Sequence, residues 1–451
     1  MTNILKKFPN DPMPVSVVGG ERYFLNLEDG RKILDFTGGW TAHNVLGLND
    51  EGLKKSIISQ LAKYPHVDTN IWSNPLLEEL ATLIIKNAPN GLDKVFFAGC
   101  NGSDAIEAAM KLSFHIHHDT GHKTKNKYIY REQSFSGSTL QALCVSDIPI
   151  FDFYEPLKPS GYIKISEHNY LRFHKHDESE EDYVERCAQE LENTILKNGP
   201  ENIAAFVGET MLGSLRGDIP PATGYWKKIK AICEKYNIHL ILDEIYCGMG
   251  RSGKVFCCNY DEITPDFICI GKGAAGGYAP ISAVVTKSKY EEIIGLGSGR
   301  IQLGHTFSGY ALGAAAMFET QKRVQTNDML NHVSKMGGLI RKYIDLELGD
   351  HQFYLETRGR GLNTAFEYKC NNQHGFSLEL QRRMMNKHSI LINAKWHRTT
   401  FTPAFIITEE DVQKVIDLYC SEFKDISKNW TGINDSAAIL PRSHGGKSPG
   451  A

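Results

Sequence analysis

Short, almost continuously apolar runs alternate with longer segments of helical spacing along the first two thirds of the chain. The runs of strand length occupy residues 94–99, 127–132, 202–209, 239–244, 266–271 and 282–286. Between them, residues 103–116 and 224–236 place apolar side chains three and four positions apart, as one face of a helix does. Strands that are apolar on both faces and separated by helices predict a mostly parallel central sheet flanked by helices, an α/β fold.

Both ends of the chain follow a different pattern, which predicts a second, smaller α+β domain. Residues 21–36 predict two short strands joined by a turn. From about Tyr310 onward helical spacing dominates, and residues 358–368 predict a glycine-rich segment leading into a strand. The expected boundaries are residues 1–65 for the N-terminal part of the small domain, 66–310 for the large domain, 311–430 for the C-terminal part of the small domain and 431–451 for a flexible tail.

The length of 451 residues suits two substantial domains, because a single hydrophobic core rarely grows to this size. Hydrophobic residues make up 41% and charged residues 23% of the chain, as in ordinary globular proteins. The net charge of −3 provides no basic field for nucleic acid or an anionic membrane, and no run approaches the roughly 20 apolar residues that cross a bilayer. The N-terminus lacks the apolar run of a secretory signal, so we expect a cytoplasmic protein.

Cysteine and histidine usage indicates neither a disulfide framework nor a metal site. The ten cysteines are scattered, form no CxxC pair and suit reduced thiols. Four histidines lie close together in a stretch rich in lysine and aspartate, where we expect solvated side chains. These histidines are His115, His117, His118 and His122. We therefore expect no metal.

Two strands of the predicted sheet end in residues that can do chemistry. The strand HLIL ends in Asp243-Glu244, and the strand DFICI ends in Lys272 between Gly271 and Gly273. In a parallel α/β sheet, ligands bind beyond the carboxyl ends of the strands, and glycines let the backbone pass close to a bulky ligand. Pyridoxal 5′-phosphate (PLP) requires a lysine amine and an acid that keeps its pyridine nitrogen protonated. The pair matches that requirement, although a lone lysine after a strand is more often a solvated turn residue.

A third element supplies a candidate anion site. The strand at residues 94–99 continues through Cys100-Asn101-Gly102-Ser103 into a helix. Backbone N–H groups at a helix N-terminus bind anions, and the Ser103 hydroxyl can add a further donor. An ordinary helix cap formed by Ser103 is the alternative interpretation.

Two glycine-rich segments are similar to nucleotide-binding motifs but lack their context. Residues 248–253 match GxGxxG, yet four residues separate this segment from the preceding strand and no helical pattern follows it. The GKS at residues 446–448 lacks the upstream glycine of a phosphate loop. Neither segment therefore predicts a dinucleotide or nucleotide site.

Taken together and in this order, these segments resemble the class III aminotransferases, in particular those acting on ω-amino acids or amines with pyruvate-like acceptors. The resemblance extends from about residue 20 to residue 430. The matching segments are FFAGCNGSDAIEAAMKL, LILDEIYCGMGRSGK, ICIGKGAAGGYAPISAVV, HTFSGYALGAAAM and RGRGLNTAFE. The resemblance implies PLP fold type I, a homodimer with shared active sites, and a transaminase that moves an amino group from an amine or amino acid to a keto acid or aldehyde.

The resemblance also implies a role for each matching residue. Lys272 is similar to the Schiff-base lysine that moves the proton, and Asp243 is similar to the acid that faces the pyridine nitrogen. The other implied cofactor residues are Gly102 and Ser103 at the phosphate, Phe135 and Ile245 on the two ring faces, Glu209 near the Asp243 network, and Thr306 reaching the phosphate from the partner subunit. Trp40 is similar to an aromatic residue of the substrate pocket, for which ordinary packing is the alternative.

Several positions depart from the pattern of that family, and they leave the substrate open. Ser136 stands where a histidine is usual, Asp104 where a glutamate is usual, and Tyr246 where a smaller or amide side chain is usual. Thr400 stands where an arginine often grips an α-carboxylate. In an extended segment Arg398 would point to the same face as Thr400 and partly replace that arginine; a surface charge is the alternative.

Two other functions stay open on the sequence. An aminomutase on the same scaffold would keep the amino group on one molecule, and the missing carboxylate arginine is compatible with it. A PLP-binding regulator or a non-catalytic interaction protein would usually carry a basic DNA-binding segment, which this sequence lacks. The leading hypothesis is a homodimeric transaminase that takes a small-molecule amino donor and a keto acceptor, with no nucleic acid or membrane partner.

Overall fold

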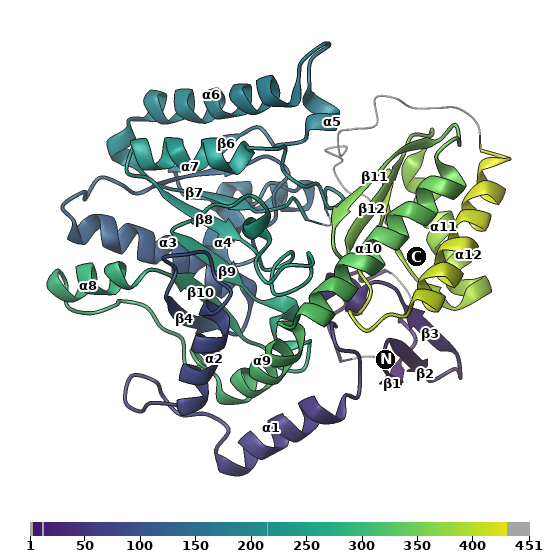
Figure 1. Ribbon diagram of the computed structural model, residues 1–451, viewed down its shortest axis with the longest axis horizontal. Coiled ribbons are helices and arrows are strands. Elements are labelled where there is room, and N and C mark those ends of the chain that lie inside the picture. Colours follow the sequence, from purple (N-terminus) through teal and green to yellow (C-terminus); the bar gives the residue numbers. More distant parts are fainter. Residues whose placement is uncertain (1–2, 11–12, 214, 431–451) are drawn as a thin grey trace.

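A seven-stranded sheet forms the centre of the larger part of the molecule (Figure 1). The computed structural model describes residues 3–10, 13–213 and 215–430. In spatial order the strands are β4 (Lys94–Gly99), β10 (Ser282–Thr286), β9 (Phe267–Ile270), β8 (His239–Asp243), β7 (Ile203–Glu209), β5 (Lys127–Arg131) and β6 (Tyr162–Ile165). Only β10 runs antiparallel to its neighbours among these strands. The predicted, mostly parallel α/β sheet is therefore confirmed.

Helices cover both faces of this sheet, as the alternation along β8 shows. Ile241 packs in the core that includes α3 (Gly102–Asp119), whereas Leu240 and Leu242 pack in the core that includes α6 and α7. Successive side chains of a strand point to opposite faces, so the two helix layers lie on opposite sides. The other helices around this sheet are α1 (Glu51–Lys63), α2 (Pro75–Ile85), α4 (Leu140–Cys144), α5 (Tyr170–Phe173), α6 (Glu180–Asn198), α7 (Tyr225–Lys235), α8 (Ser288–Leu296) and α9 (Ala311–Val324).

The two ends of the chain meet in a second group of elements, to the right in Figure 1. One sheet contains β1 (Val17–Glu21), β2 (Phe24–Leu27), β3 (Lys32–Asp35) and β13 (Ile390–Leu391), and the other contains β11 (Tyr354–Arg360), β12 (Asn363–Tyr368), β15 (Arg398–Phe401) and β14 (Asn393–Lys395). The helices are α10 (Asn327–Leu348), α11 (Gln373–His388) and α12 (Glu409–Ser427). Because β13 pairs in parallel with β3, a strand from one end of the chain completes a sheet from the other.

A shared hydrophobic core holds these two ends together. Tyr23 and Phe36, from the N-terminal part, are buried in the same cluster as Phe366, Tyr419 and Phe423. Burying five large side chains in one cluster favours a single packed unit. This packing is in line with a small domain built from both ends, and its boundaries stay a prediction.

The glycine-rich segment at residues 358–368 leads into a strand, as predicted, and that strand is β12. The segment also includes the end of β11 and a turn, so its glycines lie in a hairpin. Gly361 takes the left-handed backbone conformation in that turn, with φ at 55°. A Cβ atom at this position would lie 2.4 Å from the carbonyl carbon of Ser252. Glycine suits this turn for two reasons: it adopts the left-handed conformation, and it leaves room for the backbone of Ser252 to approach closely.

The prediction of solvated histidines is wrong for His117. His118 and His122 are exposed, but the ring of His117 is 1% exposed and stacks on His239, with 4.1 Å between ring centroids. Its Nε2 lies 3.0 Å from the carbonyl oxygen of Ala204, which accepts the hydrogen bond. The lysines and aspartates near His117 in the sequence do not determine its environment, because the turn of α3 that contains His117 packs against the sheet.

Residues 3–10, 13–213 and 215–430 lack two features that would point to a membrane or to a metal ion. In those ranges no helix combines the length with the apolar character that a membrane span needs. The same residues contain no group of three or more His, Cys, Asp or Glu side chains that could hold a metal ion. The predicted tail at residues 431–451, with its GKS, lies outside the described residues.

Two adjacent glycines of α10 allow a matched test of the contact between this helix and the turn that joins β11 to β12. A Cβ atom on Gly337 would lie 1.7 Å from the carbonyl oxygen of Gly361, whereas nothing lies within 4 Å of one on Gly338. We expect Gly337→Ala to lower the free energy of unfolding by about 1–3 kcal/mol, because the helix and the hairpin turn must move apart. We expect Gly338→Ala to raise it by up to about 1 kcal/mol, as alanine favours a helix interior. Chemical denaturation of both variants measures the difference, and equal effects would contradict the contact.

Candidate functional site

A cavity of about 260 Å³ lies at the carboxyl ends of the central strands. Seven of the residues predicted from the sequence line it together: Gly102, Ser103, Phe135, Glu209, Asp243, Ile245 and Lys272. Residues that had no predicted role also line it, among them Ser136, Met211, Leu215, Tyr246 and Cys247. The parallel arrangement of β7, β8 and β9 brings their ends to one edge, which is why residues far apart in sequence meet there.

Two carboxylates stand side by side in this cavity. Glu209 ends β7 and Asp243 ends β8, and the two residues are direct partners in the strand pairing. Burial raises the pKa of Asp243 to about 6, although the Ile245 N–H and Lys272 oppose the rise. Burial, followed by the neighbouring Asp243, raises the pKa of Glu209 to about 7. At neutral pH the pair therefore lies close to a change in its total charge.

Lys272 follows β9 and is aimed by an unusual backbone conformation. Its φ is 44°, in the left-handed region that residues with a side chain rarely adopt. Its Nζ lies 4.9 Å from the ring centroid of Tyr246, within cation–π distance. Burial lowers the pKa of Lys272, and the negative charges of Asp243 and Glu209 oppose that shift. The lysine therefore has an unusually favourable neutral form inside the cavity.

The N-terminus of α3 faces the cavity, but its cap is not the residue that the alternative interpretation named. Asn101 caps the helix: its Oδ1 accepts from the Asp104 N–H at 3.2 Å. Asp104 completes a capping box, because its Oδ2 accepts from the N–H groups of Asn101, at 3.1 Å, and Cys100, at 2.8 Å. Ser103 Oγ instead accepts from the Ser138 N–H at 3.0 Å and lines the cavity. The backbone donors of Gly102 and Ser103 remain in the first turn, where an anion binds.

Gly102 and Ile245 are in close contact across the cavity wall. A Cβ atom on Gly102 would lie 2.7 Å from Cδ1 of Ile245, so any larger residue would displace this side chain. The backbone N–H of Ile245 donates to Oδ1 of Asp243 at 3.0 Å. The same residue therefore forms part of the wall and orients the carboxylate.

Glu209 also connects two loops around the cavity. Its Oε1 accepts from the Phe135 N–H at 3.1 Å, and its Oε2 accepts from the Gly213 N–H at 2.9 Å. The Ser136 side chain hydrogen-bonds to Asp243 and lowers the pKa of that residue. Together these bonds fix the position of the Phe135 loop relative to both carboxylates.

Three predicted residues lie outside the cavity lining. Thr306 is exposed, and its carbonyl oxygen lies 2.7 Å from His66 Nε2. Trp40 is 37% exposed, in a segment with three successive residues of positive φ, Gly38, Gly39 and Trp40. The Nζ of Lys395 lies 4.5 Å from the Trp40 ring centroid. Within one subunit these residues therefore do not contact the carboxylate pair.

The third of them, Arg398, is not the surface charge that one alternative proposed. Its side chain is 1% exposed, and its guanidinium donates to the carbonyl oxygen of Leu215, a residue of the cavity lining. Burial, followed by Arg216 and Arg358, lowers its pKa to about 9. The segment forms β15, so the extended backbone on which the shared face of Arg398 and Thr400 depends is present. Arg398 therefore lies directly behind one wall of the cavity.

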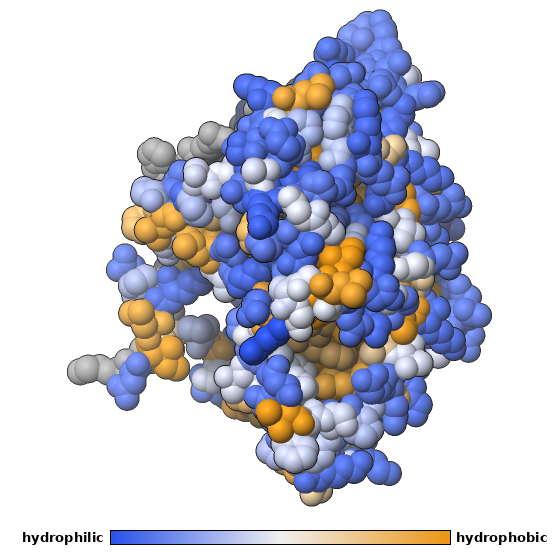
Figure 2. All heavy atoms as spheres, turned by 90° about the vertical axis from the view of Figure 1, so that its left-hand side faces the viewer, coloured by the Kyte–Doolittle hydropathy of each residue, from blue (hydrophilic) through white to orange (hydrophobic). Residues whose placement is uncertain are grey.

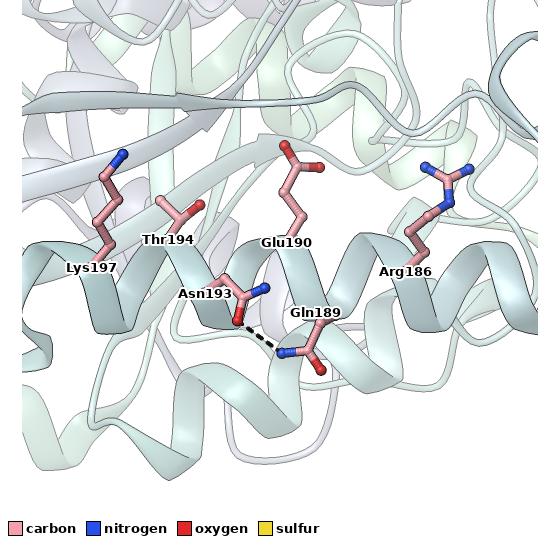
Figure 3. Close-up of a pocket in the computed structure, with 6 residues that line it drawn as sticks. All are labelled: Arg186, Gln189, Glu190, Asn193, Thr194 and Lys197. Carbon is pink, nitrogen blue, oxygen red and sulfur yellow. Dashed lines mark hydrogen bonds between the residues drawn. The ribbon is translucent and has the colours of Figure 1, made fainter.

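A hollow on α6 lacks the buried lysine and carboxylates of the cavity described above. Figure 3 shows the residues that line it projecting from that one helix. They are Arg186, Gln189, Glu190, Asn193, Thr194 and Lys197. The amide of Gln189 donates to Oδ1 of Asn193 at 3.1 Å, a contact within one helical turn. No residue predicted from the sequence lies there, and we assign no function to it.

The residues of the cavity fit PLP. A lysine, a buried acid and a helix N-terminus match its aldehyde, its ring nitrogen and its phosphate. The absence of a side chain at Gly102 lets Ile245 pack closely against the first turn of α3, and Ile245 and Phe135 supply apolar surface to the cavity. In the sequence, Tyr246 and Ser136 stood out only because they differ from the family pattern. Met211 and Leu215 gave no sequence signal, because only the folded structure brings their loop to the cavity.

Comparison with known proteins agrees with this geometry. A family model described as Aminotransferase class-III matches residues 7–421. An aminotransferase of Gibberella zeae is 32% identical over 366 residues, which cover 80% of this chain and 71% of that protein. Gamma aminobutyrate transaminase 2 of Solanum lycopersicum is 30% identical over 431 residues, which cover 93% of each chain. Other relatives are named as mitochondrial or chloroplastic, so the cytoplasmic location stays a prediction.

Solved structures are similar over nearly the whole chain. The omega transaminase from Pseudomonas jessenii in complex with PMP has a TM-score of 0.86 and 29% sequence identity, covering 92% of this chain and 93% of that one. The PMP-bound form of an aminotransferase from Vibrio fluvialis has a TM-score of 0.85 and 25% identity, covering 93% of this chain and 94% of that one. Both therefore share the fold of this chain over more than nine tenths of its length.

Proposed function

The chain belongs to the aminotransferase class-III family and is a PLP-dependent transaminase of fold type I, and from this premise we propose which of its residues carry the reaction. Its substrates are an amino donor and a keto acceptor. The observation that supports the proposal is the convergence of Lys272, Asp243 and Glu209 with the N-terminus of α3 in one cavity. The relatives bear the names of transaminases, which gives no support to the aminomutase or to the non-catalytic alternative.

Besides Lys272, which would bind the aldehyde carbon covalently, five residues would hold the cofactor. The first-turn N–H groups of α3 at Gly102 and Ser103 would donate to the phosphate. Asp243 would accept a hydrogen bond from the protonated ring nitrogen, and Phe135 and Ile245 would pack on the two ring faces. When bound, PLP supplies an electron-withdrawing ring that stabilises negative charge on the substrate carbon.

Proton movement falls to Lys272. It must be neutral to remove a proton from the substrate carbon, and its burial favours the neutral form. Asp243 must be ionised to keep a proton on the ring nitrogen, although burial raises its pKa to about 6. A cationic ring nitrogen beside it would offset that cost. Glu209 would orient the loop that carries Phe135 through its hydrogen bond to that residue.

Substitution of Lys272 and Asp243 tests these roles separately. We expect Lys272→Ala to lose both turnover and the visible absorption of PLP that survives gel filtration, because the covalent bond and the base disappear together. Asp243→Asn should retain PLP, but turnover should fall at least roughly 100-fold, about 2.7 kcal/mol of barrier. Lys228→Ala, on the outer surface of α7, is the control and should keep both properties. A Lys272→Ala protein that retains bound PLP and turnover would sink the assignment.

A homodimer would place Thr306 beside the phosphate of a partner subunit. The support is the exposed apolar side chains of the two segments that meet here through His66 and Thr306. Phe307 follows Thr306 and is 47% exposed, and Ile71 and Trp72 lie a few residues after His66 and are 70% and 65% exposed. His66, which binds the carbonyl of Thr306, also packs against the Phe307 ring at 5.4 Å between centroids. Large apolar side chains that gather on a surface are typical of a protein interface.

Mixing of two inactive variants tests the shared site. Lys272→Ala and Thr306→Ala subunits should each have low activity alone. After reversible dissociation and reassociation of the mixture, hybrid dimers would contain one site with both wild-type groups, so part of the activity should return. Turnover of the mixture, compared with each variant treated alone, measures this. A fully active monomer in light scattering would contradict the shared site.

The substrate would be a donor whose reacting carbon bears no carboxylate, such as an ω-amino acid or an amine. Thr400 is 2% exposed and pairs with Ala365 and Asn393 in the sheet, and a threonine hydroxyl lacks the charged fork of a guanidinium. Two relatives are named gamma-aminobutyrate transaminases, and that substrate is an ω-amino acid.

A remote carboxylate of the substrate would be attracted to the β14–β15 hairpin. Lys395 and Arg398 are direct partners across this hairpin, and Lys395 lies against the ring of Trp40. Burial, followed by Arg398, lowers the pKa of Lys395 to about 8. Two cations that oppose each other are destabilising, and a carboxylate near them would relieve the repulsion. Trp40 would then form an apolar wall between this charge and the cavity.

A pair of matched donors tests the hairpin. We expect Lys395→Met to lower kcat/KM for 4-aminobutyrate about 10-fold, which corresponds to about 1.4 kcal/mol, because a charged hydrogen bond is lost. The value for butylamine, which lacks the carboxylate, should change less than about twofold. Arg398→Ala should also lower kcat/KM for 4-aminobutyrate. If the Arg398→Ala protein does not fold, because the arginine is buried, Lys395→Met still tests the proposal. Strong preference for an α-amino acid that both variants leave unchanged would contradict the proposal.

A further inference from the structure

A polar cavity of about 370 Å³ lies at the amino ends of the central strands, on the opposite edge of the sheet from the PLP cavity. His239 begins β8, Asp266 directly precedes β9, and Lys287 directly follows the antiparallel β10. We call it the amino-edge pocket and define it by His117, Lys230, His239, Asp266, Lys287 and Lys289. Figure 2 views the molecule from the side where α3 and α8 end, and that face is mainly hydrophilic with small separate apolar patches.

The buried carboxylate of the amino-edge pocket belongs to Asp266, and both of its oxygens already accept hydrogen bonds. Oδ1 of Asp266 accepts from Lys287 Nζ at 2.7 Å and from the Tyr290 hydroxyl at 2.6 Å. Its Oδ2 accepts from Lys230 Nζ at 3.0 Å and from the Leu240 N–H at 2.9 Å. Burial alone would raise the pKa of Asp266, but Lys230, His239 and Lys287 hold it well below its usual value. This carboxylate therefore cannot serve further donors.

The lysines of the pocket bring more donors and more charge than its acids can satisfy. Each ammonium group has three N–H donors, and Lys230 and Lys287 share the single carboxylate of Asp266. Lys289 adds a third lysine at the rim. The other acid in the lining, Glu234, is 66% exposed and lies 3.5 Å from Lys230, so solvent weakens its effect. The pocket therefore presents donors that face a polar space.

Two buried imidazoles also line the pocket, and both are neutral at pH 7. The Nε2 of His117 donates to the carbonyl of Ala204 at 3.0 Å, and the Ser113 hydroxyl donates to the same oxygen at 3.4 Å. Since Ser113 donates there, its oxygen accepts from His239 Nδ1 at 2.9 Å. Each neutral ring thus donates through one nitrogen and carries a lone pair on the other, so the positive charge of the pocket comes from its lysines alone. Burial, followed by nearby positive charge, lowers the pKa of His117 to about 4 and that of His239 to about 3.

We propose that the amino-edge pocket is a second ligand site, which binds a small oxyanion of the phosphate type, either free phosphate or a phosphate monoester. A tetrahedral dianion offers several acceptors at once, which suits lysines that converge from α7 and from the segment after β10. Its charge also offsets the excess of the three lysines over the buried Asp266. The site is independent of transamination, because the sheet separates it from Lys272.

Calorimetric titration of inorganic phosphate into PLP-saturated enzyme tests the proposal. The buffer should contain no other oxyanion, with sodium chloride at matched ionic strength as the reference. We expect saturable binding of phosphate and of sulfate. A tighter phenyl phosphate complex would support a monoester as the ligand, and equal or weaker binding would support the free anion. Absence of saturable heat would overturn the proposal.

Three lysine variants locate the binding. Lys287→Met should weaken phosphate binding at least roughly 10-fold, and Lys289→Met, at the exposed rim, should weaken it in the same direction. Lys289→Met also keeps the test valid if Lys287→Met fails to fold. Lys123→Met is the matched control, because Lys123 is exposed on the adjacent loop and outside the pocket lining, and its affinity should match the wild type. Equal affinity in all three variants would overturn the proposal.

Discussion

The active cavity depends on one electrostatic arrangement, the placement of two buried carboxylates on neighbouring parallel strands beside a single lysine. Each charge alone would be costly in a low-dielectric interior, and removing one partner would leave the others uncompensated. The raised pKa values of Glu209 and Asp243 show that Lys272 offsets only part of this cost. The residual negative charge would favour a ligand with a proton-bearing nitrogen, so under the proposed roles the cofactor would be selected by charge as well as by shape.

The rest of the cavity holds this arrangement in place before any ligand binds. The capping box of Asn101 and Asp104 sets where α3 begins, and the contact between Gly102 and Ile245 sets how closely that helix approaches β8. The bond from Ile245 to Asp243 then links the anion site to the acid. Such preorganisation means that binding orders few groups, so most of the interaction energy is kept.

Apolar periodicity and strand-end position are local signals, so they predicted the strands of the central sheet and pointed to Lys272, Asp243 and Ser103. The other cavity residues predicted from the sequence came from the resemblance to the family; they are Gly102, Phe135, Glu209 and Ile245. The sequence did not predict the environments of His117 and Arg398. Both are buried by partners distant in sequence, α3 against β8 in one case and β15 against the Leu215 loop in the other. The choice of Asn101 over Ser103 as the cap also escaped prediction, since both residue types cap helices and only the backbone course distinguishes them.

The pairing of β3 with β13 has a consequence for how the protein is made. Translation delivers the N-terminal strands first, yet their neighbour in the sheet and most of their core partners leave the ribosome only after the whole large sheet has been synthesised. The apolar side chains of the early strands therefore stay exposed until their partners are synthesised. Their contacts join residues that are far apart in the sequence, which slows folding. A nascent chain that stalls before α12 would combine a nearly complete central sheet with an unfinished companion domain, and it is this species that chaperones and proteases would meet.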